Sequence, residues 1–514
     1  MKHVLISLLA AVLFVISSVG ARSVEPAEEA GFKPIFNGRD LTGWDGDPAH
    51  WSVKDGAIIG ETTVENPIKT NSFLIWRQGE VDDFELRCSY RLTSDWGNSG
   101  IQYRSKEMKQ FGPWVVGGYQ ADIESGEQHT GGMYEERMRG IVAARGQRVT
   151  VDKDGRIIQG PPVGDTKELQ RYVNKKDWND YVVVAQGNHL TQTINGHVMC
   201  EVTDEQPSKA ARSGILALQL HAGQQPMHVE FKNVRLKRLP LKDRKKVVMV
   251  AGKPSHGPGE HEFNAGTLLL KKCLDENAPQ VLATAYLSGW PADRTAFDNA
   301  DAIMLYIDGG GQHPVATRQR LAEIDELTKR GVGVLCAHYA VEVEKDKGGP
   351  EFERWIGGYF ETFWSVNPTW IMTKPILAKD HPITRGVKPF DIKDEWYYHM
   401  RFRPNMEGVT AILSAVPPDS TRQGKDDPHG GNPAVRADVG KNVPEILCWA
   451  AERPDGGRGY GFTGGHYHRN WGNDDYRKLM LNAILWTAKA EVPADGVNST
   501  MSEDDLKANL DKKR

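Results

Sequence analysis

The pattern of the sequence changes near residues 241–246, and this change constrains the fold more than any other feature. Before it, short runs of alternating apolar and polar residues follow one another with turns between them, which is typical of β-strands. After the charged segment LKDRKK, continuous apolar runs alternate with helical patterns. A chain of 514 residues is also too long for one hydrophobic core. The sequence therefore predicts a multidomain protein, with an all-β sandwich in residues 31–240 and an α/β domain in residues 244–490.

The first of these domains has many strand signals and no long helical pattern. The predicted strands cover residues 51–59, 84–92, 100–104, 119–124, 181–185, 190–194, 214–220 and 228–236. Asn195-Gly196 predicts a tight hairpin between two strands, because both residues tolerate a positive φ. Short strands at this spacing favour a β-sandwich.

The second domain begins with residues 247–250, a continuous apolar run suited to a strand that is buried on both faces. Further strands are predicted at 281–286, 302–307, 332–336 and 460–463, and helices at 265–274, 317–329 and 476–488. This alternation predicts a flavodoxin-like, doubly wound parallel sheet. Residues 491–514 form a charged tail, which we expect to be loose apart from a short helix at 502–510.

Residues 1–21 have the pattern of a secretory signal peptide. Lys2 and His3 precede an apolar run that ends at Val19, and small residues follow it before Arg22. The cleavage site has no cysteine, so a lipid anchor is not expected. The sequence predicts an exported protein, either periplasmic or secreted, with no membrane insertion after the signal is removed.

Charge and cysteine usage exclude some classes of function. The formal net charge is −4 and the chain has no long basic block, so neither nucleic acid nor an anionic membrane is an expected partner. The five cysteines are far apart and lack CxxC spacing, which argues against a zinc site built from thiolates.

Residues 94–136 contain the most informative strands of the first domain. Alternation places Gln120, Asp122 and Glu124 on one face of a strand, and it places Gln102 and Arg104 on one face of the preceding strand. This face is either a ligand-binding surface or an ordinary solvated one, and the surrounding glycines and tryptophans favour a ligand site. The candidate substrate-binding residues are Trp96, Asn98, Gln102, Arg104, Trp114, Tyr119, Gln120 and Gln219.

Several segments of this domain resemble the 3-keto-disaccharide hydrolase family. They are GFKPIFNGRDLTGW, GNSGIQYRS, GGYQADIE, DWNDYVVVAQGNHLTQTINGH, LALQLHAG and VEFKNVRLKRL, in this order. The resemblance implies a concanavalin-like jelly roll that acts on glycosides already oxidised at C3. It also implies a small-molecule or oligosaccharide substrate and a sugar 3-dehydrogenase upstream in the pathway.

A ketone at C3 makes the hydrogen on C2 acidic and turns the glycosidic oxygen on C1 into a β leaving group. A base removes this hydrogen, donors hold the enolate, and an acid assists the departure of the aglycone. Water then adds, so that elimination and hydration together give net hydrolysis. The candidate base is Asp122 or Glu124, with His221 as an alternative acid or base. A divalent metal is compatible with such a cluster, but the spacing does not require one.

Histidines follow several predicted strands of the second domain. Because ligands bind beyond the carboxyl ends of parallel strands, these side chains are candidates for one shared site. The candidates are His256, His261, His338, Glu395 and His466. The segments HGPGEHEF, GVGVLCAH, DEWYY and GGHYHRNW resemble the trehalose-utilisation (ThuA-like) family, a relative of class I glutamine amidotransferases. His338 stands where an amidotransferase elbow has a glycine after its cysteine, so we expect Cys336 to be a buried thiol and not a nucleophile.

Two interpretations of the chain follow. In the first, the sandwich is an enzyme acting on 3-keto-glycosides and the ThuA-like domain has an accessory, sugar-related role. In the second, the sandwich is a non-catalytic carbohydrate-binding module that targets a catalytic ThuA-like domain, because sandwich folds host both roles.

Overall fold

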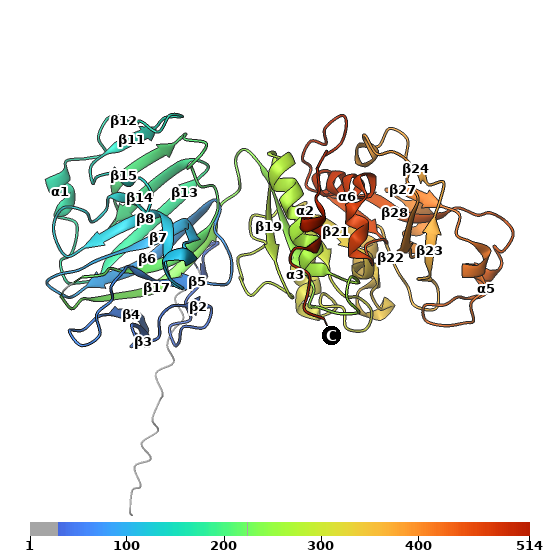
Figure 1. Cartoon of the computed structure of the whole chain (residues 1–514), viewed down its shortest axis with the longest axis horizontal. Helices are drawn as coiled ribbons and strands as arrows, with labels where there is room; N and C mark the ends of the chain where they lie inside the picture. The colour runs from blue at the N-terminus through green and yellow to red at the C-terminus, as the bar shows by residue number, and fades with distance from the viewer. Residues whose placement is uncertain (1–28, 224, 514) are drawn as a thin grey trace, which may run out of the picture.

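The computed structural model describes residues 29–223 and 225–513 and divides them between two bodies that lie side by side (Figure 1). The N-terminal body consists almost entirely of strands, and the C-terminal body combines a sheet with helices. The predicted signal peptide lies outside the described residues. Within the described ranges, every helix is too short or too polar to cross a bilayer.

Two sheets form the N-terminal sandwich. The larger has the order β12-β11-β15-β14-β13-β6-β17-β4-β3, with β1 beside β17, and the smaller has the order β10-β9-β8-β7-β16-β5-β2. The larger contains β1 (Lys33–Pro34), β3 (Trp51–Lys54), β4 (Ala57–Glu61), β6 (Phe84–Leu92), β11 (Arg148–Val151), β12 (Ile157–Gln159), β13 (Asn179–Gln186), β14 (His189–Ile194), β15 (His197–Asp204) and β17 (His228–Arg238). The smaller contains β2 (Trp44–Asp45), β5 (Ser72–Trp76), β7 (Asn98–Glu107), β8 (Val116–Glu124), β9 (Met133–Glu136), β10 (Gly140–Ala143) and β16 (Ile215–Leu220). One short helix, α1 (Thr166–Gln170), lies at the outer edge of the sandwich (Figure 1).

The alternation predicted for β8 and β16 of the smaller sheet is confirmed. Tyr119, Ala121 and Ile123 of β8 point into the core between the two sheets, and so do the three leucines of β16. The intervening Gln120 and Asp122 therefore lie on the outer face of the smaller sheet. The predicted hairpin is also present, with Ile194 opposite His197 and both turn residues at positive φ.

The C-terminal body is built on an eight-stranded sheet with the order β19-β18-β20-β21-β29-β28-β27-β24. These strands are β18 (Lys245–Ala251), β19 (Val281–Tyr286), β20 (Ala302–Tyr306), β21 (Gly333–Ala337), β24 (Ile376–Leu377), β27 (Val409–Ala415), β28 (Glu445–Glu452) and β29 (Arg458–Phe462). Two small sheets pair β22 (Gly358–Tyr359) with β26 (Arg401–Phe402) and β23 (Thr369–Met372) with β25 (Ile392–Glu395). The helices are α2 (Phe263–Asn277), α3 (Arg318–Lys329), α4 (Gly349–Ile356), α5 (Pro433–Arg436), α6 (Asp474–Thr487) and α7 (Glu503–Lys507).

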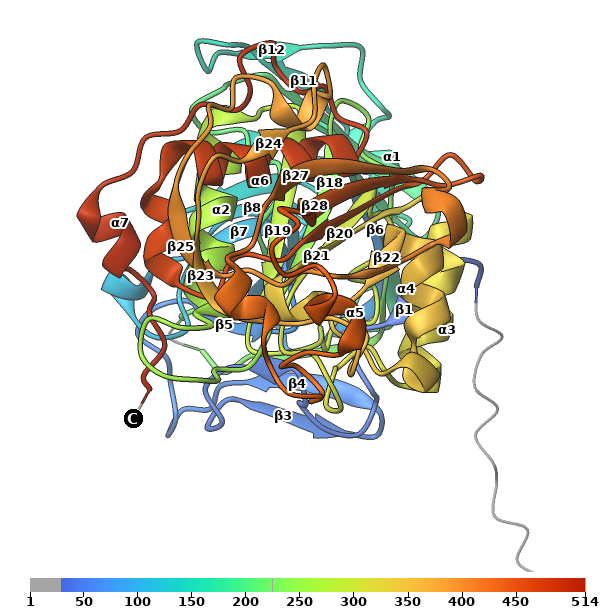
Figure 2. The same cartoon turned by 90° about the vertical axis from the view of Figure 1, so that its right-hand side faces the viewer.

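Helices cover both faces of this sheet. Val247 and Met249 of β18 belong to the same core as the apolar residues of α2 and α6, whereas Val248 and Val250 share a core with those of α3 and α4. Figure 2 shows the two pairs of helices on opposite sides of the central strands. The apolar run at the start of the domain is thus explained by burial on both faces.

The sheet is mixed, and not parallel throughout as the sequence analysis predicts. The strands from β19 to β29 run parallel, but β28, β27 and β24 continue the sheet in antiparallel fashion. Only residues 453–457 join β28 to β29, and Gly456 there has a φ of 76°. A connection this short makes a hairpin, because a parallel crossover needs about a dozen residues or more.

Buried charges join the two domains. Lys246 at the start of β18 is completely buried and donates to Asp82 of the sandwich at 2.5 Å and to Asn299 at 2.9 Å. Arg238 of β17 pairs in turn with Asp293 of the second domain at 2.8 Å. Burial opposes ionisation of Asp82, but Lys246 and Arg238 outweigh it and lower the pKa of this carboxyl to about 2. The charged segment at 241–246 therefore ends inside the structure, where it fixes one domain to the other.

The C-terminal tail packs against the second domain, although its composition predicts a loose segment. Ser502 caps α7 through a reciprocal pair of hydrogen bonds with Asp505, and Lys272 of α2 forms an ion pair with the same aspartate. Val497 is buried in the core. The predicted short helix is therefore present, but the tail is held by contacts that its charge content does not reveal.

Candidate functional sites

The outer face of the smaller sheet carries a connected set of amide and carboxyl side chains. Gln102 of β7 donates to Gln120 of β8 at 2.6 Å, and Gln120 donates in turn to Asp122 at 3.1 Å. Asn98 donates to the same carboxylate at 3.3 Å. The structure thus brings together four of the residues that the sequence analysis selected.

Asp122 is the most perturbed acid of this group. It is only 7% exposed. Burial raises its pKa to about 7, although hydrogen bonds from Gln120 and Asn98 favour the ionised form. A carboxyl group that titrates near neutrality is suited to take up and release a proton at physiological pH.

Glu136 of β9 is a second buried carboxyl on this face, and the sequence analysis did not select it. Gln219 of β16 donates to it at 3.2 Å and Asn71 at 3.3 Å, and burial raises its pKa. Tyr134 lies near both acids. Burial raises the pKa of its phenol, and the charges of Glu136 and Asp122 raise it further. A signal for Glu136 exists in the sequence, since continuing the alternation through MYEE puts Tyr134 and Glu136 on one face.

His221 and Trp96 lie at one end of this polar face. Their rings meet edge to face with centroids 6.4 Å apart, and both side chains are partly exposed. A Cβ atom on Gly223 would lie 1.7 Å from the indole ring, so only glycine allows the loop after β16 to pass Trp96 this closely. His221 Nδ1 lies 2.7 Å from the carbonyl oxygen of Ala222.

The structure places four other candidates of this domain outside the group. Arg104 is buried against Asp83 at 2.7 Å and donates to the carbonyl oxygen of Gly187, because a bulge and a φ of 47° turn it out of the alternation. Tyr119 lies in the core and donates to Asp204 at 2.5 Å. Glu124 accepts hydrogen bonds from the loop amides of Gln128 and His129. Trp114 donates to Asp45 at 3.0 Å.

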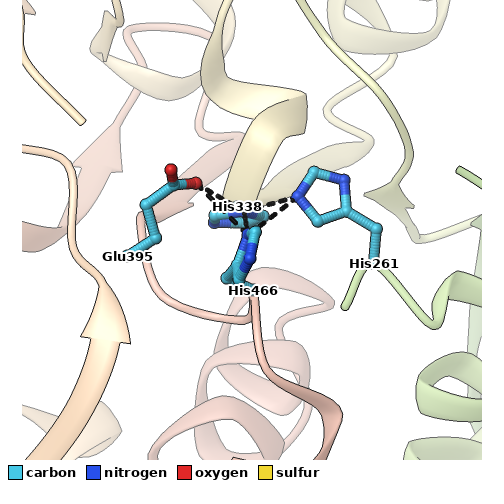
Figure 3. A group of neighbouring side chains, drawn as sticks. All are labelled: His261, His338, Glu395 and His466. Carbon is cyan, nitrogen blue, oxygen red and sulfur yellow. Dashed lines mark hydrogen bonds and ion pairs between the residues drawn. The ribbon is translucent and has the colours of Figure 1, made fainter. Parts of the chain in front are cut away.

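In the second domain, three histidines and one glutamate converge (Figure 3). His338 follows β21, His466 follows β29, His261 precedes α2, and Glu395 ends β25. One nitrogen or oxygen atom from each lies within 4.8 Å of the others. The parallel strands β18, β20, β21 and β29 are consecutive in the sheet, so the carboxyl ends of β18, β21 and β29 bring three of these side chains to one edge, as the sequence analysis predicts.

Local backbone strain and hydrogen bonds hold this cluster in place. His261 and His338 have φ values of 45° and 54°, a region that is costly for residues with a side chain and is enriched at functional sites. Asp394, which is completely buried, accepts hydrogen bonds from the amides of Gly465 and His466 and so fixes the loop after β29.

The electrostatics of the cluster follow from its burial. Burial and the neighbouring His256 lower the pKa of His261 to about 2, and burial with His261 lowers the pKa of His338. For His466 burial also opposes the charged form, but Glu395 outweighs it and raises the pKa. The lowered pKa values of His261 and His338 favour neutral imidazoles, which is the state in which histidines bind a metal ion.

Two other predictions for this domain have distinct outcomes. His256 is exposed and stacks on His261 with ring centroids 3.6 Å apart, so it borders the four-residue group without belonging to it. Cys336 is completely buried, and burial raises the pKa of its thiol. A thiol in that state is a poor nucleophile, which agrees with the expectation of a buried cysteine.

Comparison with known families now identifies the two domains. Residues 31–237 match the family model described as 3-keto-alpha-glucoside-1,2-lyase-like domain, and residues 246–487 match the model described as Trehalose utilisation. Each model matches one of the two domains. The order of the lyase-like domain and the trehalose-utilisation domain is the one that the sequence resemblance implies. At the family level this match supports a carbohydrate-related hydrolase.

Solved structures match one domain each. A candidate glycosyl hydrolase from Parabacteroides distasonis ATCC 8503 is 19% identical, with 40% of this chain and 99% of that chain covered and a TM-score of 0.27. A ThuA-like protein from Bacteroides uniformis ATCC 8492 is 15% identical, with 49% and 94% covered and a TM-score of 0.35. The carbohydrate-binding module CBM66 from Bacillus subtilis is 12% identical, with 38% and 96% covered and a TM-score of 0.26. No curated protein matches the chain.

Proposed function

We propose that the lyase-like domain cleaves glycosides that carry a ketone at C3. The observation that supports this most is Asp122, a buried carboxyl with a pKa raised to about 7 on a polar face lined by amide donors. Removal of a hydrogen next to a ketone needs a base of this strength and donors that hold the enolate oxygen. An ordinary glycosidase instead protonates a glycosidic oxygen between two carboxyls at a fixed separation.

In this proposal Asp122 takes the hydrogen from C2, and the electron pair of that bond moves into an enolate at C3. The C1–O bond then breaks, and the aglycone leaves with a proton. Glu136, the second buried carboxyl on this face, supplies this proton, and its raised pKa favours the acid form; His221, at the end of the same face, is the alternative donor. Addition of water completes net hydrolysis. Asn98 and Gln120, which donate to Asp122, and Gln219, which donates to Glu136, are the amide donors beside the two acids that can hold substrate oxygens.

The setting of this reaction is part of the proposal. The ketone has to be made by an enzyme that oxidises C3 of the sugar, such as a sugar 3-dehydrogenase. The pattern of residues 1–21 favours action in the periplasm or outside the cell.

A second candidate function rests on a different observation. The cluster of His261, His338, Glu395 and His466 is itself a candidate reaction centre. If chemistry occurs there, the lyase-like domain only binds carbohydrate, because sandwich folds host both roles.

One experiment separates these two functions. The full-length protein is incubated with a 3-keto-glucoside that bears a chromogenic aglycone, and release is compared with that from the unoxidised glucoside. We expect release from the ketone only, and loss of about 100-fold or more in Asp122→Asn. Glu85→Gln, on the opposite sheet, is the matched control and should keep the wild-type rate.

Other outcomes refute the proposal. Equal release from both glucosides would indicate an ordinary glycosidase. Release that survives in Asp122→Asn but disappears in Glu395→Gln would move the chemistry to the trehalose-utilisation domain. The Glu124→Gln variant tests the other predicted base, and we expect only a small effect because this carboxylate caps loop amides.

A further inference from the structure

Five of the six separations between the ligand atoms of the histidine cluster suit a tetrahedral metal site, and the sixth is within 4.8 Å. His338 Nε2 lies 3.0 Å from His261 Nε2 and 3.3 Å from His466 Nδ1, and the last two atoms are 3.1 Å apart. Glu395 Oε2 lies 3.3 Å from His466 Nδ1 and 3.5 Å from His338 Nε2. Four ligands bound at 2.0–2.1 Å around one zinc ion would be separated by about 3.3 Å.

The hydrogen bonds behind the cluster fix which nitrogens carry hydrogen. His338 Nδ1 lies 3.0 Å from the carbonyl oxygen of Thr463, which can only accept, so the hydrogen is on Nδ1 and Nε2 presents a lone pair. His261 Nδ1 lies 3.3 Å from a carboxylate oxygen of Asp308, which sets the same tautomer. Metal-binding histidines are held in this way, with the remote nitrogen donating to a carbonyl or carboxylate oxygen.

The contact between His261 Nε2 and His338 Nε2 favours a bound cation over a network of neutral hydrogen bonds. His466 can place a hydrogen on Nδ1 and donate it to a single neighbour. His261 and His338, however, both use their hydrogen on the outer side, so two lone pairs face each other at 3.0 Å. A cation between them makes this contact favourable.

We propose that His261, His338, His466 and Glu395 bind one divalent transition-metal ion, of which Zn²⁺ fits the geometry best. Imidazole and carboxylate ligands without thiolate suit zinc and its neighbours in the first row. This centre lies in the trehalose-utilisation domain and is independent of the reaction proposed for the other domain.

The centre is open on one side. His261 and His338 are completely or almost completely buried, but the Glu395 side chain is 20% exposed and the Glu260 side chain beside His466 is 37% exposed. Exposed His256 stacks on His261 at the same opening. Zinc with four protein ligands can accept a fifth. The ligand class that this opening admits is a small oxygen donor, such as water or the carbonyl and hydroxyl oxygens of a sugar.

The test measures metal content in full-length protein freed of ions by a chelator and then supplied with Zn²⁺. Mass spectrometry of the element should show about one zinc per chain that survives gel filtration, as expected for three or four protein ligands. His338→Ala and Glu395→Gln should each weaken binding tenfold or more, and the second substitution preserves the shape of the side chain. His381→Ala is the matched control, because this histidine of the same domain lies outside the cluster and contacts Trp486 instead.

Three results would overturn the proposal. In the first, the chain retains no zinc and its thermal unfolding midpoint does not change when zinc is added. The second is loss of zinc in His256→Ala together with full retention in Glu395→Gln, which would assign the ion to His256, His261 and Asp308, the neighbouring group. The third is a thiolate charge-transfer band in the spectrum of the Co²⁺ form, because it would make a cysteine a ligand. A Co²⁺ spectrum of four nitrogen and oxygen ligands would support the proposed set.

Discussion

The Nε2 atoms of His261 and His338 lie 3.0 Å apart, and both rings direct their hydrogen-bearing nitrogen away from this contact. The contact is therefore a repulsive one in a buried setting, where charge–dipole and dipole–dipole energies are larger than in water. Its sign reverses when a cation lies between the two atoms. The stability of the trehalose-utilisation domain is consequently tied to what the cluster binds.

Removal of metal should lower the unfolding temperature of the full-length protein. An ion present at about a thousand times its Kd stabilises the folded state by about 4 kcal/mol. Calorimetry with and without chelator measures this shift, and adding Zn²⁺ back should restore the original midpoint. Glu395→Gln should show a much smaller response to chelator, whereas an equal response in this variant would contradict the assignment.

The rate of 3-keto-glycoside cleavage should rise with pH around neutrality. Asp122 must be ionised to act as a base, and its pKa is raised to about 7, so kcat/KM should fall as pH falls below that value. Asn98→Ala should move the inflection to higher pH, because the amide of Asn98 favours the ionised carboxylate. A pH profile of kcat/KM without any inflection near neutrality would argue against Asp122 as the base.

Asp122→Asn should stabilise the protein at high pH. The pKa of Asp122 is raised from 3.8 in the unfolded chain to about 7 in the folded one, so the folded state prefers the protonated acid. Its contribution is fully present below the unfolded pKa and is lost as pH rises through the folded pKa. The free energy of unfolding of the variant, relative to that of the wild type, should be about 2–4 kcal/mol higher above pH 7 than it is near pH 4. Urea unfolding at both pH values measures this.

Arg104→Met should destabilise the fold, because Arg104 has a structural role and not a catalytic one in this proposal. The substitution leaves Asp83 buried without its partner at 2.7 Å, and breaking a buried pair in this way costs about 3–5 kcal/mol. Arg87→Met is the control on a partly exposed pair with Glu85, where about 1 kcal/mol or less is expected. A folded Arg104→Met protein that binds substrate normally but has lost all turnover would instead restore Arg104 to the site.

Asp82→Asn should weaken the junction between the domains. It leaves Lys246 buried with Asn299 alone and removes one partner of Arg238, a change of about 3–5 kcal/mol. We expect the unfolding transition to broaden or split in calorimetry as the domains separate. Asp243→Asn removes a carboxylate that is 71% exposed and should change nothing measurable.

The polar face of the sandwich was predictable because alternation alone decides which side chains share a face. Gln120 and Asp122 lie together as the pattern requires, and Tyr119 lies in the core. Arg104 departs from the pattern because a bulge shifts the register between Tyr103 and Lys106, and no local sequence signal marks that bulge. Glu136 was overlooked because a glutamate pair near glycines is usually solvated, whereas this one is buried and accepts hydrogen bonds from Gln219 and Asn71.

In the second domain the sequence analysis named all four residues of the cluster, together with His256, which only borders it. The rule that ligands lie beyond strand ends selects His338 and His466 correctly, because both follow parallel strands. The same rule cannot separate His256 from His261, since both lie in one loop and only the loop geometry turns the second inward. The sequence analysis did not predict β27 and β28, and it did not predict an antiparallel part of the sheet. An apolar run does not show the direction of a strand until its connections are known.

The buried charges at the domain junction have an evolutionary consequence. The sandwich contributes Asp82 and Arg238, the second domain contributes Lys246 and Asp293, and each cation is paired with an anion of the other domain. An exchange of either domain for a relative that lacks its two charges would leave opposite charges without partners in a dry interface. Selection should therefore keep these four residues as a set that is inherited together, so that a lineage can recombine the pair of domains far more easily than either one alone.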